Sequence, residues 1–376
     1  MRAPARTPNH ALATITNANR VALLFARHAS QPSRSTTPSN TRPGIVPPVA
    51  TKPSGLASFP VIHGPGTLSS LPMIPKPASN PIDEYTCKTR VGEVARIRSG
   101  DRWTLGIPKR HPDSAKLLAE GEELFDKKQY AEAAVRYRKM IELDANDAIA
   151  HLLYGDVFFF GDRDYAAAVA EYRKALAIDA ANPLAHFFSA NALMRLDRAD
   201  DARAAVATAL SYDPAYTNLF KVLSAEPDAF GLRPVVRYKF EPPRGYLGKP
   251  DDKGIAIYGG ADNEWLLYAI CKAVLRNEPD ARKEALGDVE EVEASFEEER
   301  ACVAVQIGAS LNRAGSRAAA PPLTRHLVDV AEAGLLDAYV AFEILGQRCP
   351  IAASMYPEEL HVDVEKYVRR YLVVKK

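Results

Sequence analysis

The sequence predicts a mainly α-helical protein, in which a short stack of helical repeats follows a disordered segment and precedes a second helical region. Three observations predict this class. A pattern of small and apolar residues recurs every 34 or 35 residues between Ser114 and Pro214, a period typical of helical solenoids. Helical periodicity returns from Asp262 to the C-terminus. The first 82 residues hold half of the 28 prolines but no Asp or Glu.

Residues 1–82 form a basic segment rich in Pro, Ser and Thr. Its Lys and Arg side chains give a local charge of +8, so the net charge of +1 leaves −7 for the rest of the chain. A segment of this composition buries too little apolar surface to offset its conformational entropy. We therefore expect residues 1–82 to be disordered.

Three explanations fit this basic segment. Its acid-free, Arg-rich composition resembles an organelle transit peptide, in which VALLFARHA would form one amphipathic turn. It could otherwise be a basic linker that touches anionic surfaces, or the result of a start codon assigned too far upstream. Unless it directs import into an organelle, we expect a cytoplasmic protein.

The repeats begin after residues 83–113, which we leave as an unassigned linker. Three segments that start at Ala115, Ala148 and Pro183 align with one another. Small residues in this alignment let two helices approach closely, and aromatic residues fill the space between neighbouring repeats. The aligned columns are Gly121, Gly155 and Ala190; Leu124, Phe158 and Leu193; Ala133, Ala168 and Ala202; Tyr137, Tyr172 and Val206; and Met140, Ala175 and Ala209.

These columns resemble the tetratricopeptide repeat (TPR), a helix-turn-helix unit of 34 residues with small residues in both helices and an aromatic residue one turn later. The endings Asp144-Ala145-Asn146, Asp179-Ala180-Ala181-Asn182 and Asp213-Pro214 resemble the turn that closes each unit. The resemblance implies a three-repeat solenoid over residues 114–225, including AYTNLFKVLSA as a capping helix. It departs from the family early in each first helix, where a large aromatic residue is replaced by Leu117, His151 and His186.

The resemblance also implies a concave groove lined by the first helix of each repeat. Phe158 lies in a packing column and is expected in the core, and the turn after Phe160 is one residue longer than in the neighbouring repeats. Phe159 and Phe160 follow that column and are expected to face the groove. On the same register, the expected groove residues are Leu118, Glu122, Phe125, Asp126, Leu152, Asp156, Phe159, Phe160, Phe187, Asn191, Met194 and Arg195.

An exposed apolar groove of this kind usually holds an extended peptide or an amphipathic helix. We expect the occupant to be another protein, and the alternative is that the chain's own C-terminal region fills the groove. Relatives that bind chaperone C-terminal tails use Lys, Asn and Arg as a carboxylate clamp. Here the matching residues are apolar or acidic, so such tails are not expected to bind: Leu118, Glu122, Leu153, Leu184 and Phe188.

The region after the repeats has no recognised family pattern. Residues 226–261 contain the β-prone runs PVVRYKF and GIAIYGG and predict a loop or a β-hairpin insertion. Residues 262–376 predict a C-terminal helical domain that begins with DNEWLLYAICKAVLRN, for which Asp262 is a good N-cap. Further helices are expected in EEVEASFEEERACVAVQIGASL, PPLTRHLVDVAEAG, LLDAYVAFEILGQ and ELHVDVEKYVRRYLVV, with Leu335 to Leu345 as the buried helix.

Candidate chemical sites are weak. His151 and His186 occupy equivalent places in successive repeats, but no third ligand accompanies them, so packing or surface roles are favoured over a metal site. Gly259-Gly260 lacks the surrounding motif of a phosphate-binding loop and predicts a plain turn. The acidic run from Glu290 to Glu299 spreads around a helix and predicts a solvated face.

The cysteines and the apolar runs exclude further classes. Cys87, Cys271, Cys302 and Cys349 form no CxxC pair, so we expect neither a zinc site nor a disulfide framework, and a reducing compartment fits best. The apolar run Val21 to Ala26 is too short for a signal-peptide core or a membrane-spanning helix.

The favoured function is that of a non-enzymatic adaptor or scaffold that binds a protein partner through the repeats. We expect no catalytic residue, cofactor, metal or specific nucleic-acid partner, because no nucleophile or phosphate-binding motif is present. The alternative is an enzyme or ligand-binding protein whose active domain is the C-terminal half, with the repeats as a regulatory or dimerising arm. A concave pocket with converging polar side chains in that half would favour the alternative.

Overall fold

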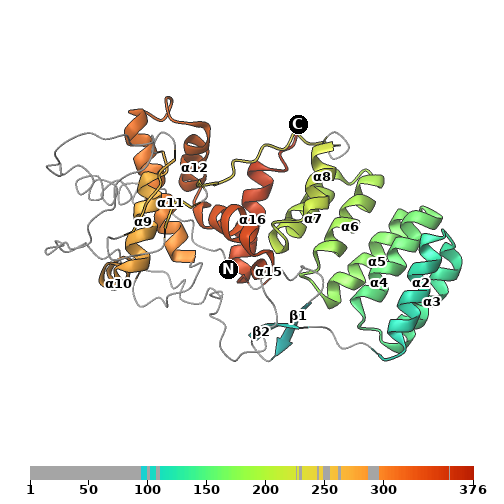
Figure 1. Ribbon diagram of the computed structural model, residues 1–376. Coiled ribbons are helices and arrows are strands. Elements are labelled where there is room, and N and C mark those ends of the chain that lie inside the picture. Colours follow the sequence, from blue (N-terminus) through green and yellow to red (C-terminus); the bar gives the residue numbers. More distant parts are fainter. Residues whose placement is uncertain are drawn as a thin grey trace, which may run out of the picture. The chain divides into compact units, whose positions relative to one another are not determined.

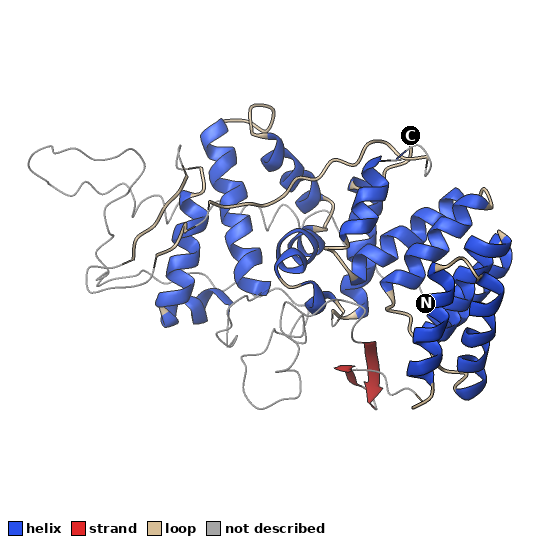
Figure 2. Ribbon diagram, turned by 45° about the vertical axis from the view of Figure 1, so that its right-hand side comes forward, coloured by secondary structure: helices blue, strands red, loops and turns tan. Residues whose placement is uncertain are grey.

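The computed structural model describes residues 95–99, 102–106, 111–225, 227, 231–243, 245–248, 255–260, 264–286, 296–354 and 356–376. Helices form most of the regular structure of these residues (Figures 1 and 2). Contacts between Cα atoms divide the chain into two compact units. We call residues 77–237 with 341–376 the repeat unit, and residues 238–340 the middle unit. The predicted disorder of residues 1–82 lies outside the described residues.

The repeat unit contains the three predicted helix pairs, in which each helix packs against the next one along the chain (Figure 1). The pairs are α2 (Ser114–Asp126) with α3 (Tyr130–Leu143), α4 (Ala148–Val157) with α5 (Tyr165–Ile178), and α6 (Pro183–Arg195) with α7 (Ala199–Tyr212). The mainly helical repeat fold that the sequence predicts is therefore confirmed.

The aligned columns of the sequence are the packing contacts of these pairs. Tyr137 and Tyr172 are fully buried. A Cβ atom added to Gly121 would lie 2.5 Å from Cε1 of Tyr137, and one added to Gly155 would lie 2.5 Å from Cε1 of Tyr172. Such short distances leave no room for a methyl group, so the tyrosine ring opposite each of these two positions requires glycine there.

The turns that close the repeats are held by aspartate side chains. The Oδ1 atoms of Asp144, Asp179 and Asp213 each accept a backbone N–H from the residue two positions later, at 2.9, 3.2 and 3.2 Å. Asp and Asn favour such turns because their short side chains bond to the nearby backbone. The next helix then starts with its own cap, since Asp147 accepts N–H groups at 3.0 and 3.2 Å and Asn182 accepts one at 3.1 Å.

The additional residue of the second repeat lies in the helix and not in the connecting turn as predicted. Residues Phe158–Asp162 form a π-helical turn, η2, at the end of α4. A π-helical turn uses more residues than an α-helical turn, so it absorbs a one-residue insertion and rotates the side chains that follow. Phe158, expected in the core, is only partly buried, and Val157, the residue before the π-helical turn, is buried. A Cβ atom on Gly161 would lie 2.8 Å from Cβ of Tyr130, which fixes the turn against α3.

Helices α8 (Thr217–Ala225) and α16 (Glu358–Tyr371) are the longest helices that follow the third repeat within the repeat unit. Helix α8 occupies the segment predicted as a capping helix. Helix α16 packs along α7 (Figure 1). In this contact the Thr208 hydroxyl donates to Glu365 at 2.8 Å, and the His361 ring lies 4.1 Å from that of Tyr212. The C-terminal helix thus covers a face of the third repeat, and the segment expected as one C-terminal domain, 262–376, is divided between the two units.

Strands are few among the described residues. β1 (Ala95–Ser99) pairs antiparallel with β2 (Arg102–Gly106), within the stretch that the sequence analysis left unassigned. The signal was present in the sequence, because Gly-Asp between two short runs is typical of a hairpin. In the segment 226–261, the described residues form only isolated bridges, which pair Leu247 with Ile257 and Leu232 with Lys375.

The middle unit is a group of helices in which α9 and α11 pack together. The run from Leu335 to Leu345, predicted to be a buried helix, is buried except at Asp337, which is partly exposed. It forms α13 (Leu336–Tyr339) and the π-helical turn η4 (Val340–Leu345), at which the chain returns to the repeat unit. The other helices of the middle unit are α9 (Leu266–Asn277), α10 (Pro279–Leu286), α11 (Phe296–Ala314) and α12 (Pro322–Glu332). The short helices α14 (Gly346–Arg348) and α15 (Pro350–Ala353) belong to the repeat unit and precede α16.

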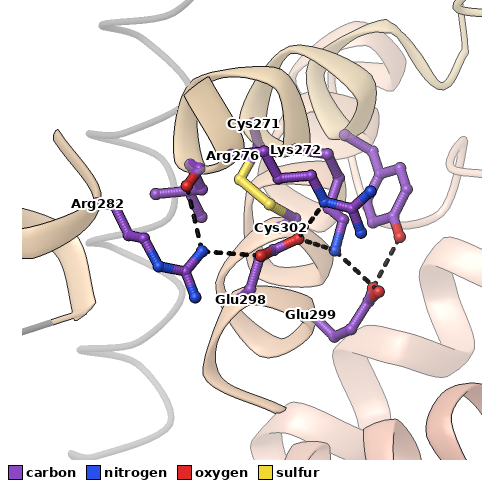
Figure 3. Close-up of a disulfide and its surroundings, with 9 residues drawn as sticks. Cys271, Lys272, Arg276, Arg282, Glu298, Glu299 and Cys302 are labelled. Carbon is purple, nitrogen blue, oxygen red and sulfur yellow. Dashed lines mark hydrogen bonds and ion pairs between the residues drawn. A yellow bond between two sulfur atoms is a disulfide. The ribbon is translucent and has the colours of Figure 1, made fainter. Parts of the chain in front are cut away.

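A disulfide joins the two main helices of the middle unit (Figure 3). Cys271 of α9 and Cys302 of α11 are bonded, with their Cα atoms 5.5 Å apart. The prediction that the cysteines form no disulfide is therefore wrong, because helix packing brings together two residues that are separated by 31 positions in sequence. The expectation of a reducing compartment rested on that prediction and loses its support.

Buried charges lie beside the disulfide (Figure 3). Lys272 forms ion pairs with Glu298 and with Glu299, at 2.9 Å for the latter, and all three side chains are inaccessible to solvent. Glu298 also accepts from Arg276 at 3.1 Å and Arg282 at 3.0 Å. Burial alone would raise the pKa of Glu298, but Lys272, Arg282 and Arg276 hold it below its usual value. The acidic run was predicted to be a solvated face, and for Glu298 and Glu299 that prediction is wrong, because cations from α9 and α10 face them.

We expect Ala168→Leu to destabilise the repeat unit. Ala168 is fully buried, so the larger side chain overpacks the contact between helices and costs about 1–3 kcal/mol of unfolding free energy. Ala170→Leu on the exposed side of the same helix is the control and should change stability by less than about 0.5 kcal/mol. Chemical denaturation of both variants measures the difference. Equal stabilities would contradict the assigned packing columns.

We expect Lys272→Met to destabilise the middle unit more strongly. The substitution leaves Glu298 and Glu299 buried with less compensating charge, and loss of one partner from a buried ion pair costs about 3–5 kcal/mol. The control is Arg317→Met, because Arg317 is exposed and pairs with Asp329 and Glu332 on the surface, where an ion pair contributes roughly 0–1 kcal/mol. A stable Lys272→Met variant would show that this cluster does not hold α9 to α11.

Candidate functional site

The strongest candidate site is the surface on the first helix of each repeat, and we call its twelve predicted residues the inner surface. Four of them are exposed, namely Glu122, Asp126, Phe160 and Arg195. Six are partly buried, namely Leu118, Phe125, Phe159, Phe187, Asn191 and Met194. Leu152 and Asp156 are only 4% and 7% exposed, so the expectation that both would line an open surface is corrected. They lie in the middle repeat, which has neighbours on both sides.

Aromatic rings from two repeats meet at one end of the inner surface. The Phe160 ring lies 5.7 Å from that of Phe125 and 4.8 Å from that of Phe159, measured between centroids. Tyr130 packs against Phe125 at 5.1 Å, and Tyr165 packs against Phe159 at 5.3 Å. Most of these contacts are edge-to-face, a favourable arrangement for aromatic pairs. We call these five residues the aromatic cluster.

Phe160 is the most accessible member of the aromatic cluster. Its side chain is 46% exposed, and no other phenylalanine among the described residues reaches the exposed class. The π-helical turn η2 holds it there, since Arg163 at the end of the turn adopts a left-handed backbone conformation, with φ of 55°, and Asp164 donates its N–H to the carbonyl of Phe158 at 3.0 Å. The cluster therefore presents a large apolar side chain on a well-supported backbone.

The third repeat continues the inner surface with a second group of rings. Phe187 lies 5.4 Å from Tyr216 and 5.4 Å from Phe188. Phe188 in turn stacks on the buried Tyr172 at 6.2 Å. Asn191 donates its side-chain amide to the carbonyl of Phe187 at 3.1 Å, so this polar group is engaged by its own helix.

A buried carboxylate lies between the two groups of rings. Asp156 Oδ1 accepts a hydrogen bond from the Tyr172 hydroxyl at 2.6 Å. Burial raises the pKa of Asp156 to about 7, although the bond from Tyr172 acts in the opposite direction. A carboxyl group with this pKa changes its charge near neutral pH.

Further acids lie around this carboxylate. Burial raises the pKa of Tyr137, and the charges of Glu122, Asp156 and Asp126 raise it further. Burial likewise raises the pKa of Tyr216, with added effects of Asp213 and Asp156. Carboxylates from α2, from α4 and from the turn after α7 therefore act on the same region. The inner surface has an electronegative centre.

The sequence analysis missed several members of this site. Tyr130 and Tyr165 were not assigned, although each is the first residue of the second helix in its repeat and they lie 35 positions apart. That spacing was a usable signal. Tyr216 and Asp213 follow the last repeat, where the column alignment ends, so the repeat pattern did not extend to them.

The two repeat histidines have structural roles. His151 Nδ1 lies 2.8 Å from Glu171, and its Nε2 lies 3.3 Å from the carbonyl of Ala145. His186 Nε2 lies 2.9 Å from the equivalent carbonyl, that of Ala180. Both rings thus bond to the turn that precedes their helix. Within the described ranges, no three His, Cys, Asp or Glu side chains are arranged to hold a metal ion.

The charged cluster of the middle unit is the other place where polar groups converge. Its carboxylates are inaccessible to solvent and bonded to Lys272, Arg276, Arg282 and the hydroxyl of Tyr268 (Figure 3). An active site needs groups that reach a substrate. These ion pairs connect helices to one another. They give no support to an active site in this cluster.

In the part of the chain that the structure describes, no helix combines the length and the apolar character that a membrane span requires.

Comparisons with known proteins identify the repeats. Residues 159–225 match a family model described as tetratricopeptide repeat. The search of curated proteins found no match. Twenty-eight chains of solved structures match, among them the first TPR of Spaghetti (RPAP3) bound to HSP90 peptide SRMEEVD, with 18% identity, a TM-score of 0.30 and coverage of 32% of this chain and 98% of that chain. The family match, together with the columns and helix pairs that extend the same unit back to Ser114, shows that this chain carries tetratricopeptide repeats.

Proposed function

We propose that this protein is a non-enzymatic adaptor or scaffold that binds a partner protein on the inner surface of its repeats. The observation that carries the proposal is the aromatic cluster, in which Phe160 is 46% exposed although it lies in a π-helical turn that packs closely against Tyr130 of α3. Large rigid aromatic side chains are the usual anchors of protein interfaces because they bury much area at little entropic cost.

The form of the inner surface suits an elongated ligand. The aromatic cluster lies on the first two repeats, and the rings around Phe187 lie on the third. A ligand that contacts both groups crosses the first helices of all three repeats. An extended peptide or an amphipathic helix has this form and presents apolar side chains at regular intervals.

The acidic centre of the surface argues against one class of ligand. One of the solved structures similar to this chain is a TPR domain bound to an HSP90 peptide. In this chain, Glu122 is exposed and Asp156 is buried close by. A C-terminal carboxylate placed there meets like charge, which disfavours binding. We therefore propose a partner other than a chaperone tail.

We expect Phe159→Ser combined with Phe160→Ser to reduce partner binding and leave folding intact. Loss of a central aromatic anchor commonly costs about 2 kcal/mol or more, which corresponds to roughly a thirtyfold weaker affinity. Peptides selected from a random library on the intact protein serve as ligands, and fluorescence anisotropy measures their affinities. Thermal unfolding of each variant is measured in parallel.

The matched control for the aromatic pair is Val135→Ser combined with Leu143→Ser. These residues are 39% and 40% exposed on α3, outside the inner surface. The control should bind the selected peptides like the parent. If the two double variants lose affinity equally, or if neither does, the inner surface is not the binding site.

We expect the peptide SRMEEVD to show no specific binding. The positions where a carboxylate clamp needs polar and cationic side chains are apolar or acidic in this chain, so the Kd of the peptide should be larger than about 1 mM, equivalent to about −4 kcal/mol. Fluorescence anisotropy of the labelled peptide measures this affinity. The comparison is the same peptide with its C-terminal carboxylate replaced by an amide. Tight binding that requires the free carboxylate would contradict the proposed class of partner.

A further inference from the structure

The charges on the inner surface indicate which side chains its ligand carries. Among its twelve residues, Glu122, Asp126 and Asp156 are acidic and only Arg195 is basic. Asp213, whose pKa burial raises to about 6, acts on the same region through Tyr216. A ligand that fits both the rings and the acids carries apolar side chains next to Lys or Arg.

Asp156 is a buried acid of this surface, only 7% exposed, whereas Glu122 and Asp126 are exposed acids. Asp156 faces the hydroxyl of Tyr172 from α5, and it acts on Tyr137 of α3 and on Tyr216 before α8. In the described part of the chain, no cation is among the groups that shift its pKa. An arginine or lysine from a ligand would pair with the exposed Glu122 or Asp126, and the charge of Asp156 would attract it further through the low-dielectric interior.

The chain itself contains a segment of this composition. Residues 1–82 carry a charge of +8 and no acid, and their longest apolar run, Val21 to Ala26, is bracketed by Arg20 and Arg27. Phe25 supplies an aromatic side chain within that run. Residues 20–28 thus combine apolar side chains, which fit the aromatic cluster, with arginines, which fit the acidic residues of the inner surface.

We propose that residues 20–28 of this chain bind intramolecularly to the inner surface, with their apolar side chains against the aromatic cluster and an arginine paired with the exposed Glu122 and Asp126. This proposal rests on the proposed function, because it identifies a segment of this chain that binds to the same inner surface as the partner protein. A partner with a basic and apolar segment would then bind by displacing residues 20–28. The N-terminal segment acts as a built-in competitor.

Because residues 20–28 are covalently connected to the repeats, even a weak affinity gives high occupancy of the inner surface. About 85 residues, which include the β1–β2 hairpin, connect residue 28 to α2. A covalent connection of this kind holds a segment at an effective concentration on the order of 1 mM. A segment with a Kd of about 100 µM would therefore occupy the surface roughly nine-tenths of the time and weaken a competitor about tenfold.

The test uses a labelled probe peptide of residues 17–30 and full-length protein. One protein is the parent, and the other carries Arg20→Glu, Phe25→Ser and Arg27→Glu, which remove the competitor. We expect the probe to bind this tail variant about tenfold more tightly than the parent. Equal affinity for both proteins overturns the proposal, because the chain's own segment then does not occupy the site.

Variants of the surface acids locate the contact. In the tail variant, Glu122→Gln with Asp126→Asn and Asp156→Asn should weaken probe binding at least tenfold. The matched control, Glu132→Gln with Glu142→Gln, removes exposed acids of α3 and should have no effect. Equal effects of the two sets overturn the proposal. If library-selected peptides still require Phe159 and Phe160 in that case, the proposed function stands without it.

The pH dependence provides an independent readout. A cation bound near Asp156 favours its ionised form, so the proton that Asp156 holds below pH 7 leaves on binding. Affinity should therefore rise as pH increases through about 7 and then level off. A probe with His28→Asn removes the titration of the peptide itself. Asp156→Asn should remove the rise near pH 7, and an unchanged profile contradicts the pairing.

Discussion

The rings of Tyr137 and Tyr172 lie so close to Gly121 and Gly155 that no side chain fits between them. This contact, made once in each of the first two repeats, sets the distance between the two helices of a pair. The other aligned columns follow from it, since Ala133 and the equivalent alanines are fully buried where the same helices meet. The spacing of the first helices, and with it the inner surface, depends on this contact.

The same packing also connects the core to the surface. Tyr172 fills the space opposite Gly155 and donates its hydroxyl to Asp156, so one residue both positions a helix and fixes the central carboxylate. The π-helical turn has a similar double effect, because Gly161 packs on Tyr130 while Phe160 is exposed beside it. Departures from the regular repeat thus coincide with the residues proposed to bind.

The repeats could be predicted because their contacts are local and recur in the sequence at a fixed period. The period does not reveal the rotation caused by η2, so Phe158 was placed in the core and Val157 was overlooked. It also says nothing about contacts between distant segments. The burial of Glu298, the Cys271–Cys302 bond and the position of α16 on α7 depend on such contacts and were not predictable from a single sequence.

The central claim is that the inner surface of the repeats is a binding site for a polypeptide segment. A photoreactive phenylalanine analogue placed at position 160 of the full-length protein tests it most directly, with the same analogue at position 135 of α3 as the comparison. Mass spectrometry of the illuminated protein identifies what each position touches. The account predicts cross-links from position 160 to a basic, apolar segment, lost when the probe peptide of residues 17–30 is added. Identical products from both positions, or none from position 160, would contradict it.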